Sequence, residues 1–169
     1  KAHCPEAFMA AVLSSDMDKT DKVVTIIDEC NRMALKVEPP DVNASEHDFA
    51  VVEGKIRFGL NAVKNVGDSA ARAIVAARAD GGPFTSIWDF CDRVDPQVAN
   101  KRALEALARC GALDSTGDSR GGMIQVLEQA AAWGGRMQAD RLAGQGSIFD
   151  LGGEEESRPQ QHPPVPVVE

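Results

Sequence analysis

Residues 58–77 read FGLNAVKNVGDSAARAIVAA, and this stretch decides the fold. Its first apolar residues, Leu60, Val63 and Val66, are spaced as on one face of a short helix. A turn containing Gly67 then interrupts the pattern, and a second, Ala-rich helix follows directly. Two helices joined in this way expose the amino end of the second one, whose first N–H groups have no partner within the helix.

This turn is typical of a helix-hairpin-helix, which binds the nucleic-acid backbone without reading bases. The N–H groups after Gly67 lie where the helix dipole favours an anion, and Lys64, Asn65 and Ser69 add a charge and neutral donors. We expect Gly67 to adopt the dihedrals of a tight turn and to let a phosphate approach closely. The alternative is an ordinary turn between packed helices, which Asp68 favours because a carboxylate satisfies the dipole and repels phosphate.

A second, similar unit follows. Ser86 is expected to cap a short helix, and Asn100 a longer one that stops at Gly111. Two such hairpins can share a core that one of about 20 residues could hardly bury alone. Lys101 and Arg102 lie in the first turn of the last helix, where cations are unfavourable unless a phosphate lies nearby. Two solvated surface charges explain them equally well.

The amino-terminal part predicts two helices. Pro5 suits a first helical position, and Thr20 with Asp21 is expected to cap the second helix. The buried stripe of that helix would comprise Val23, Val24, Ile27, Cys30 and Met33. Residues 36–43 contain two prolines and predict an extended path. Short β-rich runs on either side of Glu53-Gly54 predict a β-hairpin, expected to be the only sheet.

Towards the carboxyl end a further helix is predicted from Met123 to Trp133, ended by Gly134-Gly135. Residues 152–169 are acidic and Pro-rich, which indicates a disordered tail or linker. The predicted fold is therefore mainly α: a tandem helix-hairpin-helix with one small β-hairpin, preceded by helices and followed by a helix and the tail.

Charge is distributed unevenly along the chain. The net charge is −8, but it divides into −6 over residues 1–54, +3 over residues 55–109 and −5 over residues 110–169. The only positive block contains the hairpin around Gly67, and a modest positive patch can hold phosphates through local contacts. No apolar run is long enough to span a membrane. Because the chain begins with Lys1 and not Met, we expect it to be a piece of a longer polypeptide.

Catalytic and metal-binding constellations are not evident. The cysteines Cys4, Cys30, Cys91 and Cys110 lack ligand spacing and are interpreted as free thiols packed as small apolar groups in a reducing cytoplasm. The histidines, His47 among them, have no convincing partners. In a polar setting, Gln145-Gly146-Ser147-Ile148-Phe149 carries an isolated apolar pair suited to docking on another protein. A chance contact with the parent domain is the alternative.

Taken together, these blocks resemble one family. The opening KAHCPEAFMAAVLSS, the run TDKVVTIIDECNRM and the turn KVEPPDVNAS resemble the end of the fingers region of bacterial replicative C-family DNA polymerases, the DNA polymerase III alpha subunits. IRFGLNAVKNVGDSAARAIVAAR, GGPFTSIWDFCDRV and NKRALEALARCGALD resemble their tandem helix-hairpin-helix segment. The resemblance covers about residues 1–117. Cys4 departs from an expected aromatic residue, and Asn65 replaces the first hairpin glycine.

The resemblance implies a division of the chain into fingers residues 1–47, a DNA-binding module 48–115, a helical connector 116–143 and a segment 144–169 with a clamp-binding peptide and the tail. The parent enzyme would extend primers with magnesium ions held by palm carboxylates. Those carboxylates are missing here, so the fragment has no catalytic residues, metal ligands or cofactor of its own and should be inactive. The implied contacts to duplex phosphates are Lys64, Asn65, Val66, Gly67 and Ser69, and in the second hairpin Asn100, Lys101 and Arg102.

The implied partners are double-stranded primer–template DNA, the ring-shaped beta sliding clamp and other replisome polymerase subunits in the cytoplasm, without a membrane. The clamp-binding peptide would comprise Gln145, Ser147, Ile148 and Phe149, with the last two supplying the buried area. Two alternatives stay open: a protein-interaction scaffold without DNA contact, which the acidic flanks favour, and the same region of an error-prone family relative.

Overall fold

The computed structural model describes residues 3–146 and 162–167. The chain begins with two helices, α1 (Pro5–Ser15) and α2 (Thr20–Arg32). Pro5 is the first helical residue of α1, as predicted. Thr20 is not a cap: it already belongs to α2, whose N-cap position is occupied by Lys19 without a capping side chain. Val24 is also exposed and not buried as predicted, because only the face of α2 with Val23 and Cys30 meets the core.

A small sheet follows. Its strands are β1 (Val37–Glu38), β2 (Ala50–Val52) and β3 (Lys55–Arg57), in the order β1-β3-β2. The predicted β-hairpin is confirmed, since β2 and β3 are antiparallel and both turn residues, Glu53 and Gly54, have positive φ, as a two-residue turn of the I′ type requires. This is the one sheet of the described residues, as expected, but the hairpin is not the whole of it, because β1 adds to β3 in parallel. A two-residue strand has no periodicity by which to recognise it.

The two hairpins follow the sheet in the chain. The first comprises the 3-10 helix η1 (Leu60–Ala62) and α3 (Asp68–Gly81), and the second comprises α4 (Ile87–Arg93) and α5 (Lys101–Arg109). Both predicted caps are confirmed: Ser86 Oγ accepts from the Asp89 N–H at 3.0 Å, and Asn100 Oδ1 from the Ala103 N–H at 3.1 Å. Gly111 ends α5 in the left-handed region, at φ +82°.

One hydrophobic core serves both hairpins. It contains Val63, Val66 and Ile74 of the first unit together with Phe90, Leu104 and Leu107 of the second. Val42 also belongs to this core, with no exposed surface, and its N–H donates to Ala112 O at 2.8 Å. A separate cluster lies beneath α1, α2 and the sheet, and Phe58 packs against both clusters. The expectation that two hairpins share a core is therefore confirmed.

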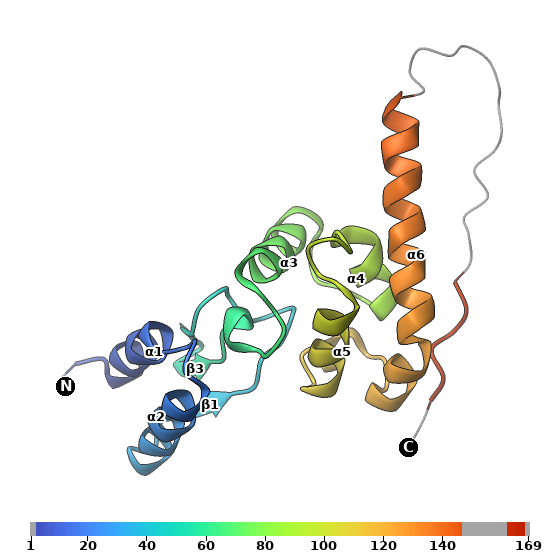
Figure 1. Ribbon diagram of the computed structural model, residues 1–169. Helices are drawn as coiled ribbons and strands as arrows, with labels where there is room; N and C mark the ends of the chain where they lie inside the picture. Colours follow the sequence, from blue (N-terminus) through green and yellow to red (C-terminus); the bar gives the residue numbers. More distant parts are fainter. Residues whose placement is uncertain (1–2, 147–161, 168–169) are drawn as a thin grey trace.

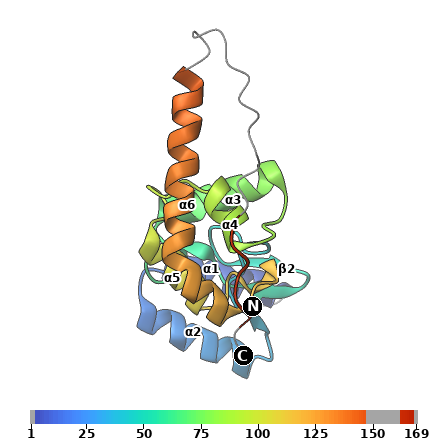
Figure 2. The same ribbon diagram turned by 90° about the vertical axis from the view of Figure 1, so that its right-hand side faces the viewer.

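The last helix is α6 (Arg120–Gly146), which follows the short η2 (Asp114–Thr116). The predicted end at Gly134-Gly135 is wrong, since both glycines lie within α6. Its amino-terminal part packs on α4 and α5, and its carboxyl-terminal part projects beyond the rest of the molecule (Figures 1 and 2). In Figure 1, α1, α2 and the sheet lie at one end and α4–α6 at the other, with α3 between them.

Residues 162–167, which we term the strap, are extended and lie beside the first turns of α6 (Figure 1). His162 stacks on Trp88 at a ring-centroid distance of 5.4 Å, and Val165 packs against the shared core. Ser119 Oγ donates to Pro166 O at 2.9 Å, and a Cβ at Gly122 would collide with that carbonyl. The predicted disordered tail is therefore wrong for these six residues, because two tryptophans and a close backbone approach hold them in place.

The four cysteines are free, as expected. Only Cys30 and Cys91 are buried, and burial raises the pKa of the Cys91 thiol to about 12. Cys4 and Cys110 are exposed, so the expectation that all four pack as apolar groups is wrong. Among the described residues no group of side chains is suited to hold a metal ion, and no helix has an apolar stretch of membrane-spanning length.

Candidate nucleic-acid interface

The turn of the first hairpin takes its shape from Asn65. This residue lies in the left-handed region at φ +68°, whereas Gly67 is in ordinary extended conformation at φ −79° and ψ 169°. The prediction that Gly67 supplies the dihedrals of the tight turn is therefore wrong. Asn65 supplies them, because asparagine tolerates left-handed backbone better than other residues with a Cβ.

The amino end of α3 is open. A Cβ placed on Gly67 would have no atom within 4 Å, and no side chain caps the helix. In the described chain the N–H groups of Asp68, Ser69 and Ala70 have no hydrogen-bond acceptor, and the first intrahelical bond is made by Ala71 N–H to Gly67 O. Three unpaired donors and the positive end of the helix dipole thus face open space, an arrangement that suits an anionic oxygen.

Asp68, which could block this end, is held by Arg72 and His47. Arg72 donates to its carboxylate twice, at 2.9 and 3.1 Å, and His47 Nε2 lies 2.8 Å from Asp68 Oδ1. The hydrogen bonds from Arg72, with a further one from His47, keep the pKa of Asp68 below its usual value. The interpretation of His47 as unpartnered is wrong, since its Nδ1 also lies 2.5 Å from Asp48 Oδ1.

The predicted contacts of the first hairpin divide into two kinds. Lys64, Asn65, Gly67 and Ser69 are exposed around the open helix end. Val66 is 3% exposed, packs in the shared core, and its N–H donates to Val63 O at 3.0 Å. Val66 therefore has no donor left for a phosphate and serves to anchor the turn.

The second hairpin differs from the first. The side chain of Asn100 already caps α5 by accepting from Ala103 N–H, so its amino end is less open than that of α3. Lys101 forms an ion pair with Glu128 of α6, and this hydrogen bond lowers the pKa of Glu128. Arg102 is exposed and has no ion pair within the described residues. No hydrogen bond joins the two turns in the described chain, so the sites stand as separate patches on one scaffold.

Sequence reasoning missed the two partners of Asp68. The pair with Arg72 has i,i+4 spacing on α3, which is a readable signal. His47 lies 21 residues before Asp68, and no local pattern predicts that contact. Of the predicted clamp peptide, Gln145 falls in the last turn of α6, and Ser147, Ile148 and Phe149 lie outside the described residues.

With this geometry in place, comparison with known proteins defines the class. The family model described as "Helix-hairpin-helix motif" matches residues 34–123, and the chain belongs to this family. Within it, the chain is 56% identical over 118 residues to DNA polymerase III subunit alpha of Pseudomonas aeruginosa, covering 69% of this chain and 10% of that protein. The subunit from Thermus aquaticus is 47% identical over 149 residues, covering 88% of this chain and 12% of that protein.

The same subunit from Escherichia coli K12 is 40% identical over 162 residues, which is 95% of this chain. The predicted resemblance to the DNA polymerase III alpha subunit is therefore confirmed. The chain spans about a tenth to a seventh of the length of these curated relatives.

Proposed function

We propose that this chain is the part of a bacterial replicative DNA polymerase that holds duplex DNA by its sugar–phosphate backbone. The observation that carries the proposal is the uncapped amino end of α3, open at Gly67 and surrounded by Lys64, Asn65 and Ser69. Backbone N–H groups bind phosphates of any sequence, which is what a polymerase that moves along DNA requires. The names of the relatives support the same assignment.

The two hairpins would contribute unequally. In the first, three free N–H groups and Lys64 would receive a phosphate, while Arg72 and His47 hold the carboxylate of Asp68. In the second, Arg102 is the readiest donor, and Lys101 would have to exchange Glu128 for a phosphate. This chain would not polymerise nucleotides alone, because in the parent enzyme magnesium and its carboxylate ligands would belong to a palm region. The setting would be the cytoplasm, with other replisome subunits.

Duplex titration at several salt concentrations tests this function. We expect equal affinity for two unrelated duplexes of about 20 base pairs, and a steep fall of affinity with salt. Lys64→Gln or Arg102→Gln should each reduce the slope of log Kd against log salt by about 1, because each removes one phosphate contact. Lys22→Gln is the matched control, since Lys22 is an exposed cation on the distant α2. Identical slopes for all variants would favour a scaffold without DNA contact.

We further propose that Gln145, Ser147, Ile148 and Phe149 form a peptide that binds the beta sliding clamp. Its first residue, Gln145, lies in the last turn of a helix that projects from the body of the molecule, which supports access by a large ring-shaped partner (Figure 1). Ile148→Ala combined with Phe149→Ala should abolish capture of the chain on immobilised clamp, because the apolar pair would supply the buried area. Leu142→Ala, which alters an exposed leucine of α6, is the control and should leave capture intact. Retained capture by the double variant would move the clamp site elsewhere.

A further inference from the structure

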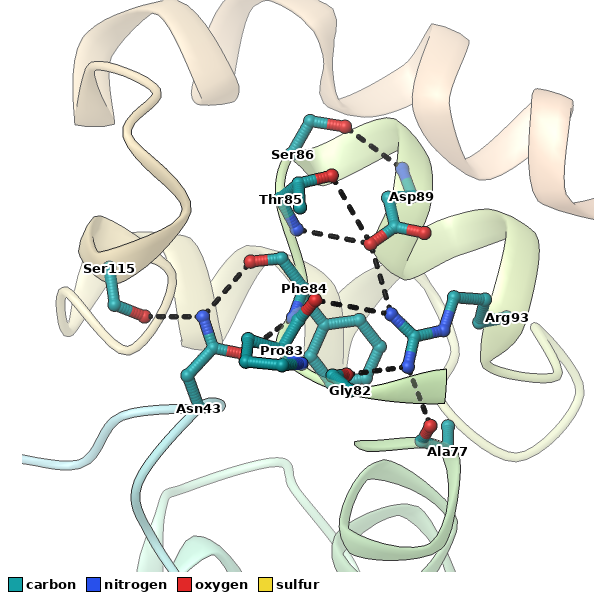
Figure 3. Close-up of polar contacts among 10 residues, drawn as sticks. All are labelled: Asn43, Ala77, Gly82, Pro83, Phe84, Thr85, Ser86, Asp89, Arg93 and Ser115. Atoms are coloured by element: carbon teal, nitrogen blue, oxygen red, sulfur yellow. Dashed lines mark hydrogen bonds and ion pairs between the residues drawn. The ribbon is translucent and has the colours of Figure 1, made fainter. Parts of the chain in front are cut away.

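One arginine makes side-chain hydrogen bonds to the end of α3 and to the connection between the two hairpins, residues 82–86 (Figure 3). Arg93 Nη2 donates to Ala77 O at 2.6 Å and to Gly82 O at 2.7 Å, while Nη1 donates to Pro83 O at 3.4 Å and to Asp89 Oδ2 at 3.0 Å. One guanidinium at the end of α4 therefore bonds to the last turn of α3, to the connection and to its own helix.

The residues around the Arg93 guanidinium leave room for it and pack against it. The side chain of Arg93 is 17% exposed, and its Cζ lies 4.4 Å from the centre of the Phe84 ring. A Cβ at Gly81 would lie 2.7 Å from Arg93 Nη2, so the glycine leaves the space that the guanidinium fills. A cation at the carboxyl end of α3 also complements the helix dipole.

Asn43 holds the same connection from the other side (Figure 3). Its Nδ2 donates to Phe84 O at 3.0 Å and its Oδ1 accepts from Phe84 N–H at 2.7 Å. The Asn43 amide therefore pairs with both backbone polar groups of Phe84. Nδ2 also lies 2.9 Å from Ser115 Oγ, which follows the second hairpin. Residues before, between and after the hairpins thus meet in one polar network.

The connection turns sharply at Gly82, which has φ +76°, and its Phe84 side chain is buried in the shared core. The bonds of Arg93 and Asn43 therefore act together with the shared core in setting the direction in which the amino end of α5 points relative to that of α3. Two weak phosphate sites on a rigid body bind one duplex jointly, because the second contact becomes intramolecular once the first has formed. If the two hairpins can rotate relative to each other, this gain in duplex affinity is lost.

We propose that Arg93 is a positioning residue for DNA binding, which sets the second hairpin so that both hairpins bind one duplex together. The inference rests on the proposed function and assigns Arg93 no contact with DNA. The positive charge of Arg93 acts within the protein, whereas those of Lys64 and Arg102 would act on the DNA.

Arg93→Lys separates positioning from charge. Lysine keeps the charge, but one ammonium group cannot reproduce the planar fork that bonds four oxygens. Arg109→Lys is the matched control, because Arg109 also ends a helix and pairs with an acidic residue four positions earlier, but is exposed. Duplex affinity and salt slope would be measured for Arg93→Lys, Arg102→Gln, their combination and Arg109→Lys, with circular dichroism to establish folding.

We expect Arg93→Lys to weaken binding about tenfold, the equivalent of one charge-assisted hydrogen bond, and to reduce the salt slope by about 1 although no charge is removed. In the Arg93→Lys background, Arg102→Gln should weaken binding less than about twofold, because the second hairpin no longer contributes. Arg109→Lys should bind like the wild type.

Wild-type affinity in Arg93→Lys, or effects of Arg93→Lys and Arg102→Gln that simply multiply, would overturn the positioning role and leave the proposed function standing. A wild-type chain that binds no duplex would overturn both. Should Arg93→Lys not fold, Asn43→Ser carries the same test, since it releases the connection from the opposite side.

Discussion

Asn65 carries the backbone strain of the first hairpin. It occupies the left-handed region, while the neighbouring Gly67 is extended and contributes open space instead. The sequence could not reveal this division, because both residues are typical of turns and φ depends on how the turn packs. The caps at Ser86 and Asn100 were predictable, since a cap is decided within three residues.

Substitution of Asn65 tests this assignment. Asn65→Ala should lower the free energy of unfolding by about 1 kcal/mol, because alanine is strained at positive φ, while Asn65→Gly should leave it nearly unchanged. Denaturant unfolding measures the difference, and Lys64→Ala, at an exposed neighbour of ordinary backbone conformation, is the control. Equal stability of the Ala and Gly variants would place the strain elsewhere.

Hydrophobic periodicity predicted the helices of the two hairpins. The prediction that two glycines end the last helix was wrong. Gly134 and Gly135 lie inside α6 for different reasons. A Cβ at Gly134 would lie 2.5 Å from Cys91 O, so this glycine allows α6 to approach α4 closely, whereas a Cβ at Gly135 would meet nothing within 4 Å. Helix propensity alone cannot anticipate such an approach, because tertiary packing overrides it.

Alanine substitutions at Gly134 and Gly135 can be compared directly, because both residues lie within α6 and only Gly134 approaches α4. Gly135→Ala should raise the free energy of unfolding by up to about 1 kcal/mol through better helix propensity. Gly134→Ala has the same local gain but should destabilise by about 1–3 kcal/mol, because α6 would have to move away from Cys91. Thermal unfolding of both variants decides the matter, and equal stabilisation would show that α6 does not rest closely on α4 in solution.

The whole molecule is held together by contacts that link distant parts of the sequence. The strap returns to Trp88, Trp133 and the first turns of α6, and the pairing of Asn43 with Phe84 spans 41 residues. None of these could be predicted from local patterns. The open helix end of the first hairpin was predictable because the hairpin is local, whereas the burial of Val66 and the bond from Arg93 to Ala77 O depend on packing.

The two valines of the strap, one packed and one exposed, test whether the strap packs against the rest of the protein. Val165 packs against the shared core and Val167 is 90% exposed. Val165→Ser should therefore lower the free energy of unfolding by about 1 kcal/mol and alter the fluorescence of the two tryptophans, whereas Val167→Ser should do neither. Indistinguishable variants would mean that the strap is undocked in solution.

The buried side chain of Val42 bears on where the chain can be cut. It is fully buried in the core that both hairpins share, although it precedes the first hairpin by 18 residues. The family match, which begins at residue 34, includes it. A gene fragment begun at residue 48 would leave a valine-sized hole there and discard Asn43 as well. The smallest independently folding piece should therefore start upstream of β1.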